Sequence, residues 1–117
     1  MGLSTFRMQG ADTTTHSAAW EKTKAVASAA ATLYTVRVYS KSATDFYLQV
    51  HDSATLPTDL TTLVAVYPCN AGMYTGDEFG SGLPIANGIY LVASSSQTAV
   101  TQIGASDAWF NCGWTAR

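Results

Sequence analysis

The chain has 117 residues, which suffices for one domain with a single hydrophobic core. Only 12% of the residues are Asp, Glu, Lys or Arg, about half the share in an average soluble domain, and Ser and Thr take their place. The net charge is −2 and the six basic residues are scattered, which excludes nucleic acid as a partner because binding a phosphate backbone needs clustered cations. A polar surface with few charges is readily covered by a neighbouring protein, which favours a part in an assembly.

Residues 1–16 are predicted to form an extended N-terminal arm, because glycines and a run of three threonines interrupt any periodic pattern. The apolar side chains of Leu3, Phe6 and Met8 flank Arg7. These four residues are candidates for an interface with another protein. A frayed terminus is the alternative.

Residues 17–32 fit two structures. Their alanines, glutamate and lysines suit a helix, whereas residues 20–27 also fit an edge strand with its charges facing outward. We prefer the strand, because every later segment has a β pattern.

Strict alternation of apolar and polar side chains begins at residue 33. Residues 33–40 and 44–52 predict an antiparallel hairpin, with Arg37, Gln49 and His51 facing outward. The expected core, drawn from this hairpin and a later strand, comprises Tyr34, Val36, Val38, Phe46, Leu48, Val50, Ile89 and Leu91.

Further short strands follow, separated by turn signals every 8–12 residues or so. A continuous apolar run at residues 62–68 predicts a strand covered on both faces. A short strand is predicted at residues 73–79 and a glycine-rich loop at residues 80–84. Two more strands, at residues 88–96 and 107–117, complete the chain. The pattern predicts an all-β protein, an antiparallel β-sandwich or jelly roll formed by residues 17–117 as a single domain.

Residues that could carry out chemistry do not form a recognisable catalytic motif. His51 and Asp52 are neighbours on a predicted strand, so their side chains point to opposite faces and cannot form a catalytic pair. Asp77 and Glu78 are adjacent, but no pattern places a second carboxylate opposite them. We therefore expect no enzymatic activity, no catalytic or metal-binding residues and no cofactor.

Aromatic side chains are the remaining candidates for binding. In the last strand, Trp109 is predicted to face away from Phe110, Cys112 and Trp114. We expect Trp20 and Trp109 to contribute to an interface. Stacking of such rings on a sugar, as in a carbohydrate-binding module, is the alternative.

Cys69 and Cys112 are expected to be reduced and unligated, because a disulfide needs oxidising surroundings and two cysteines supply no zinc framework. The sequence has no secretory h-region and no apolar stretch that approaches a membrane span of roughly 18 residues. We expect synthesis in a cytoplasm and no contact with a membrane.

Several segments of the chain resemble small structural proteins of tailed bacteriophages, namely residues 33–39, 50–52, 67–72, 79–80 and 82–95. The resemblance implies an auxiliary virion protein of the capsid decoration or cement kind, made in the host cytoplasm and located on the capsid surface. Its implied partners are the major capsid protein or other virion subunits, and further copies of itself in a homo-oligomer. A carbohydrate- or receptor-binding module of a phage tail or fibre is the alternative that the same resemblance leaves open.

Overall fold

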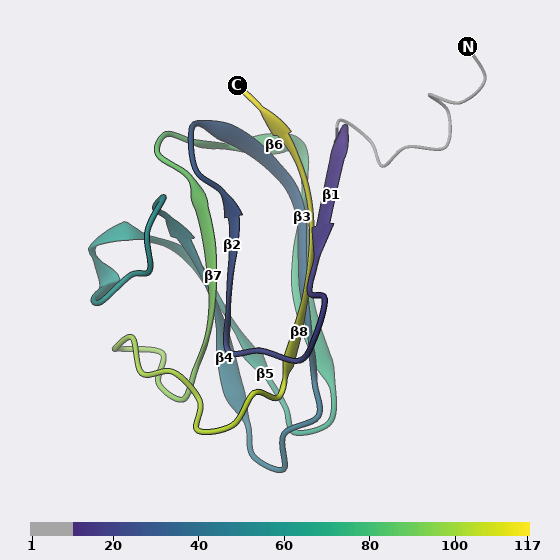
Figure 1. Cartoon of the computed structure of the whole chain (residues 1–117), viewed down its shortest axis with the longest axis vertical. Coiled ribbons are helices and arrows are strands. Elements are labelled where there is room, and N and C mark those ends of the chain that lie inside the picture. Colours follow the sequence, from purple (N-terminus) through teal and green to yellow (C-terminus); the bar gives the residue numbers. More distant parts are fainter. Residues whose placement is uncertain (1–10) are drawn as a thin grey trace, which may run out of the picture.

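The computed structural model describes residues 11–117, which form two antiparallel four-stranded sheets packed face to face (Figure 1). Sheet A has the strand order β1-β8-β3-β6, with β1 at Thr13–His16, β8 at Ala108–Ala116, β3 at Ala31–Ser40 and β6 at Tyr74–Ile85. Sheet B has the order β2-β7-β4-β5, with β2 at Thr23–Ala27, β7 at Ile89–Ser94, β4 at Phe46–Asp52 and β5 at Leu63–Cys69. A short 3-10 helix, η2 (Leu60–Thr62), precedes β5. The predicted all-β sandwich is confirmed.

The strand pairing follows a simple rule: β1 pairs with β8, β2 with β7, β3 with β6, and β4 with β5. The chain therefore runs as one long hairpin that is rolled so that alternate pairs fall in opposite sheets. Eight strands paired in this way form a jelly roll.

The core lies between the sheets and follows the predicted alternation at seven of the eight expected positions. Phe46, Leu48, Val50, Val36, Val38, Ile89 and Leu91 are fully buried. Tyr34 is the exception, because a bulge between Leu33 and Thr35 shifts the register of β3 by one residue. Leu33 is buried in its place and Tyr34 lies half-buried.

The N-terminal boundary of the sandwich differs from the prediction. Thr13–His16, assigned to the arm, form β1 and pair with residues 111–114 of β8, since β-branched threonines suit an edge strand. Residues 20–27 contain the predicted edge strand, β2. Leu3, Phe6, Arg7 and Met8 lie outside the described residues.

β5 was predicted to be covered on both faces but is not, whereas β4 and β7 are. β5 lies at the edge of sheet B, and its Val64 is 43% exposed. On β4, Gln49 and His51 were expected to face solvent but are fully buried. The side chains predicted to face the core do so, and Gln49 and His51 do point to the outer face of the strand. They are buried there because segments 53–62 and 95–103 fold over that face.

Among residues 11–117, no helix is long and apolar enough to cross a membrane.

Candidate functional site on the outer face of sheet A

The outer face of sheet A carries a cluster of aromatic side chains, Trp20, Tyr39, Tyr74 and Trp109, which we call the aromatic patch. The Trp20 and Trp109 rings meet edge to face with their centroids 5.6 Å apart. The Tyr39 and Tyr74 rings lie 5.8 Å apart. His16 of β1 extends the patch, because its ring stacks on Trp109 at 6.5 Å.

The strand register of sheet A makes the side chains of the patch point outward. Tyr39 pairs with Trp109 of β8 on one side and with Tyr74 of β6 on the other. Paired residues on neighbouring strands share a face, and Val38 points into the core, so all three rings point outward. Trp20, Tyr39 and Tyr74 are 38%, 39% and 57% exposed.

Two cations lie over rings of the patch. The Arg37 guanidinium is 5.3 Å from the centroid of the Tyr74 ring, and the Lys41 ammonium is 5.0 Å from the centroid of the Trp20 ring. Such contacts hold a charged side chain in one position without removing it from water. The patch thus presents rigid aromatic faces with positive charge alongside them.

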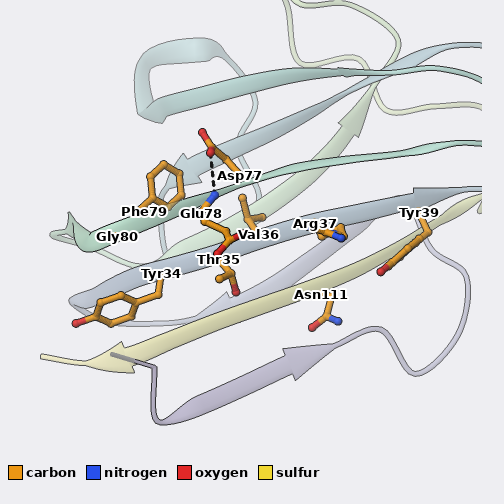
Figure 2. A pocket seen from close by; sticks show the side chains of 10 residues that line it. All are labelled: Tyr34, Thr35, Val36, Arg37, Tyr39, Asp77, Glu78, Phe79, Gly80 and Asn111. Atoms are coloured by element: carbon orange, nitrogen blue, oxygen red, sulfur yellow. Dashed lines mark hydrogen bonds between the residues drawn. The ribbon is translucent and has the colours of Figure 1, made fainter. Parts of the chain in front are cut away.

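A pocket of about 410 Å³ opens beside the patch on the same face of the sheet. Figure 2 shows Tyr34 at one end of it and Tyr39 at the other, with Arg37 and Asn111 between them. The Phe79 side chain points the other way and packs against the core. The remaining lining residues are Thr35, Val36, Asp77, Glu78 and Gly80. The pocket and the patch adjoin at Tyr39, which belongs to both, and at Arg37, which lines the pocket and lies over the Tyr74 ring.

Irregular pairing of β6 with β3 builds the closed end of the pocket. Leu33 pairs with Leu83 and Thr35 with Glu78, so residues 79–82 of β6 stand opposite the single residue Tyr34. The sequence predicted a strand ending at residue 79 and then a loop, whereas β6 runs through to Ile85 and bulges at this point. Bulges of this kind redirect side chains and are frequent beside binding sites.

One wall of the pocket is tied to the other sheet. The Tyr67 hydroxyl of β5 donates a hydrogen bond to Asp77 Oδ2 of β6 at 3.0 Å. Burial and the Asp77 carboxylate together raise the pKa of Tyr67 to about 12. The Glu78 backbone N–H donates to Asp77 Oδ1 at 2.8 Å, which fixes the carboxylate from its other side. The bond between Tyr67 and Asp77 joins two edge strands that the ladders of their own sheets do not connect.

A second polar cluster lies on sheet B, but it is closed to solvent. Burial lowers the pKa of His51, although the charge of Asp59 acts in the opposite direction. The His51 ring contacts Gln49 and Thr62, so the cluster fastens surface segments to the sheet. Asp52, which was considered with His51 as a catalytic pair, instead accepts hydrogen bonds from the backbone N–H groups of Ala86 and Asn87.

The structure places the tryptophans considered in the sequence analysis in different surroundings. Trp20 and Trp109 lie together in the aromatic patch, as described above, although they are 89 positions apart in the chain. Trp114 faces inward against the core, as expected, and its indole N–H donates to Thr15 Oγ1 at 3.0 Å. The sequence analysis missed Tyr39 and Tyr74. The alternation along β3 could have identified Tyr39, because Val36 and Val38 face the core and Tyr39 therefore faces outward.

Within residues 11–117, no three His, Cys, Asp or Glu side chains lie close enough together to share a metal ion. Cys69 and Cys112 are free and buried. Both thiols point into the core from strands of opposite sheets.

Comparison of the chain with models of protein families, with curated proteins and with solved structures finds no match.

Proposed function

We propose that this chain is a non-enzymatic structural protein of a bacteriophage virion, a decoration or cement protein that binds the assembled head shell. The observation that carries the proposal is the aromatic patch. Trp, Tyr and Arg are the residue types that dominate the binding energy of protein interfaces. Trp20, Tyr74 and Arg37 present these three types together on one exposed face.

The energetics of the patch suit repeated, modest contacts. Covering one large apolar side chain contributes about 1.5–3 kcal/mol. The low charge content of the chain means that few ions lose their water when a partner covers this face. A protein that binds only the assembled shell stabilises that state, and many symmetric copies multiply each contact.

The fold and the sequence resemblance support the same proposal. Jelly rolls occur in viral capsid proteins and in lectins, so the fold is compatible with the function without establishing it. In this proposal the partners are the major capsid protein and neighbouring copies of the chain. The protein is made in the host cytoplasm and ends on the capsid surface.

The alternative function is a carbohydrate- or receptor-binding module of a phage tail or fibre. Exposed aromatic rings favour it too, because a ring face that fits an interface also fits a sugar. The two functions differ in copy number. A decoration protein is present at a copy number comparable to that of the main shell subunit, whereas a tail or fibre module is present in few copies.

The test measures incorporation into particles of the phage that encodes the chain. Quantitative mass spectrometry of purified heads should find many copies of the wild-type protein. Trp20→Ala and Tyr74→Ala should reduce the number of copies while leaving the melting temperature of the free protein nearly unchanged. Leu56→Ala is the matched control, because Leu56 is 42% exposed but lies in segment 53–62 over sheet B. Absence from heads, or equal incorporation of all variants, would contradict the proposal.

A further inference from the structure

The pocket beside the aromatic patch combines two kinds of surface. Tyr34 forms an aromatic wall at one end, and Tyr39 lies at the other (Figure 2). Tyr34 and Tyr39 are five residues apart on β3, which corresponds to about 17 Å of extended strand. The volume of about 410 Å³ lies in the range of pockets that hold small ligands.

The floor between these aromatic ends is polar and offers complementary hydrogen-bonding groups. Arg37 can only donate, an ionised Glu78 can only accept, and Asn111 can do both. A ligand hydroxyl group also does both, so a row of hydroxyls can bind to all three side chains. A purely apolar ligand would leave these groups without partners, at a cost of about 1–3 kcal/mol for each one that it buries.

Charge narrows the class of ligand. Glu78 contributes the carboxylate that faces the pocket beside the Arg37 guanidinium. Asp77 pairs with the inward-facing Val36, and its carboxylate is bonded to Tyr67 on the other side of sheet A. The charges of Glu78 and Arg37 cancel, so the lining offers no net attraction to a phosphate, a sulfate or an acidic sugar. A neutral sugar carries hydroxyl groups on its edge and polarised C–H groups on its face, and such C–H groups are attracted to the negative face of an aromatic ring.

We infer that this pocket binds an uncharged saccharide, with a sugar ring stacked on Tyr34 and its hydroxyl groups bonded to Arg37, Glu78 and Asn111. The inference does not depend on the proposed function. A pocket of this kind would give a particle-bound protein, or a free one, a second binding activity distinct from contact through Trp20 and Trp109.

The geometry around Tyr34 supports a preformed site. A Cβ atom at Gly82 would lie 3.0 Å from the Tyr34 ring and would clash with the Thr32 side chain, so the glycine allows both side chains to lie against the backbone of β6. A ring held in place loses little conformational entropy on binding, which favours affinity.

The experiment uses the full chain on an array of neutral and acidic glycans, followed by calorimetric titration of the oligosaccharides that bind. We expect neutral glycans among the ligands and no acidic ones. Tyr34→Ala should weaken binding roughly tenfold, the equivalent of about 1.4 kcal/mol. Tyr34→Phe should retain binding, because it keeps the ring face. Leu56→Ala is the matched control, because Leu56 is exposed and lies in segment 53–62 over sheet B, and it should bind as the wild type does.

Glu78→Ala provides a second variant on an exposed residue, should Tyr34→Ala fail to fold. It should also weaken binding to the neutral glycan. The inference is overturned if no neutral glycan on the array binds, if only acidic glycans bind, or if Tyr34→Ala and Glu78→Ala bind as tightly as Leu56→Ala. Incorporation into particles is measured separately, so failure of this inference leaves the proposed function standing.

Discussion

The side-chain oxygen Oε1 of Gln49 lies 3.0 Å from ring nitrogen Nε2 of His51, and both residues are fully buried on the outer face of β4. The Gln49 amide nitrogen donates to the carbonyl oxygens of Ser96 and Ala99 at 3.0 and 2.9 Å. This orientation leaves Oε1 as the acceptor, so His51 must carry its proton on Nε2. In the neutral ring, Nδ1 then accepts from the Thr62 hydroxyl at 2.9 Å.

We predict that the protein loses stability as the pH falls below about 6.5, the ordinary pKa of His51. Burial lowers the pKa of His51 in the folded state, so the unfolded chain binds this proton more readily. The stabilisation is therefore complete above about pH 6.5 and declines progressively toward the lowered pKa. Urea denaturation at a series of pH values between about 8 and 5 measures the slope.

His51→Gln separates this histidine from every other titrating group, because glutamine does not ionise. The variant should be less stable than the wild type at neutral pH, but its stability should vary less with pH across the same window. The carboxyl groups of Asp52 and Asp59 do not interfere, since both have pKa values below the ordinary 3.8. Parallel profiles for the two proteins would show that His51 does not set the acid sensitivity.

Replacement of Gln49 by leucine should destabilise the protein by at least about 2 kcal/mol. The change keeps the side-chain volume similar but leaves the His51 N–H without its acceptor. It also removes one donor to the carbonyl oxygens of Ser96 and Ala99, which then keep only the Ser94 hydroxyl. The free energy of unfolding measures the effect. Gln97→Leu is the control in the same segment, because Gln97 is exposed, and it should be nearly neutral. Equal effects of the two substitutions would mean that the buried cluster contributes little.

The sequence predicted the sandwich because alternation on β3, β4 and β7 is strict and because a one-residue change of register would bury the wrong face. It did not predict the burial of Gln49 and His51. Alternation identifies the two faces of a strand, but it cannot show that segments distant in the chain cover the polar face. Here the covering segments are fastened by carbonyl groups, which every residue has and which leave no compositional signal.

The candidate site was predictable only in part. Trp20 and Trp109 stood out as large aromatic residues, but their contact depends on the pairing of β1 and β8 across the whole length of the chain. Tyr34 was assigned to the core because the bulge after Leu33 is invisible to a period-two pattern. The glycine-rich segment at residues 80–82 did mark an irregularity. Nothing in the sequence showed that it would form the wall of a pocket inside a continuous strand.

Tyr67 provides a prediction at alkaline pH. Its folded-state pKa, raised to about 12 by burial and by Asp77, exceeds the ordinary value of 10.0. The stabilisation is complete below about pH 10 and is lost as the pH rises toward 12, because the unfolded chain releases the phenolic proton first.

Tyr67→Phe should cost about 0.5–1.5 kcal/mol at neutral pH by removing the hydrogen bond to Asp77. Absorbance of tyrosinate during a pH titration gives the pKa directly, and Tyr67→Phe should lack the late step. An identical titration curve for the variant would show that Tyr67 is not the late group.

The two thiols should be inert in the folded protein. Burial raises the pKa of Cys112 to about 12, and burial together with the Asp45 charge raises that of Cys69. The thiolate is the reactive form, so a thiol reagent at about pH 8 should label neither residue until a denaturant is added. Mass spectrometry before and after reduction checks that no disulfide is present. Rapid labelling of the native protein would place at least one thiol at the surface.

Gly82→Ala should destabilise the protein by at least about 1 kcal/mol and displace Tyr34. Gly82 has φ of +90°, a conformation that a residue with a Cβ atom rarely adopts, and the new atom would meet Thr32 and the Tyr34 ring. Gly80→Ala is the matched control two residues earlier in the same bulge. A Cβ atom at Gly80 has no neighbour within 4 Å, and its φ lies outside the positive range, so this variant should unfold at nearly the wild-type urea concentration. Urea denaturation of both variants decides the matter. If Gly80→Ala costs as much as Gly82→Ala, the bulge tolerates no side chain anywhere, and the specific fit of Gly82 beneath Tyr34 is not what shapes the pocket.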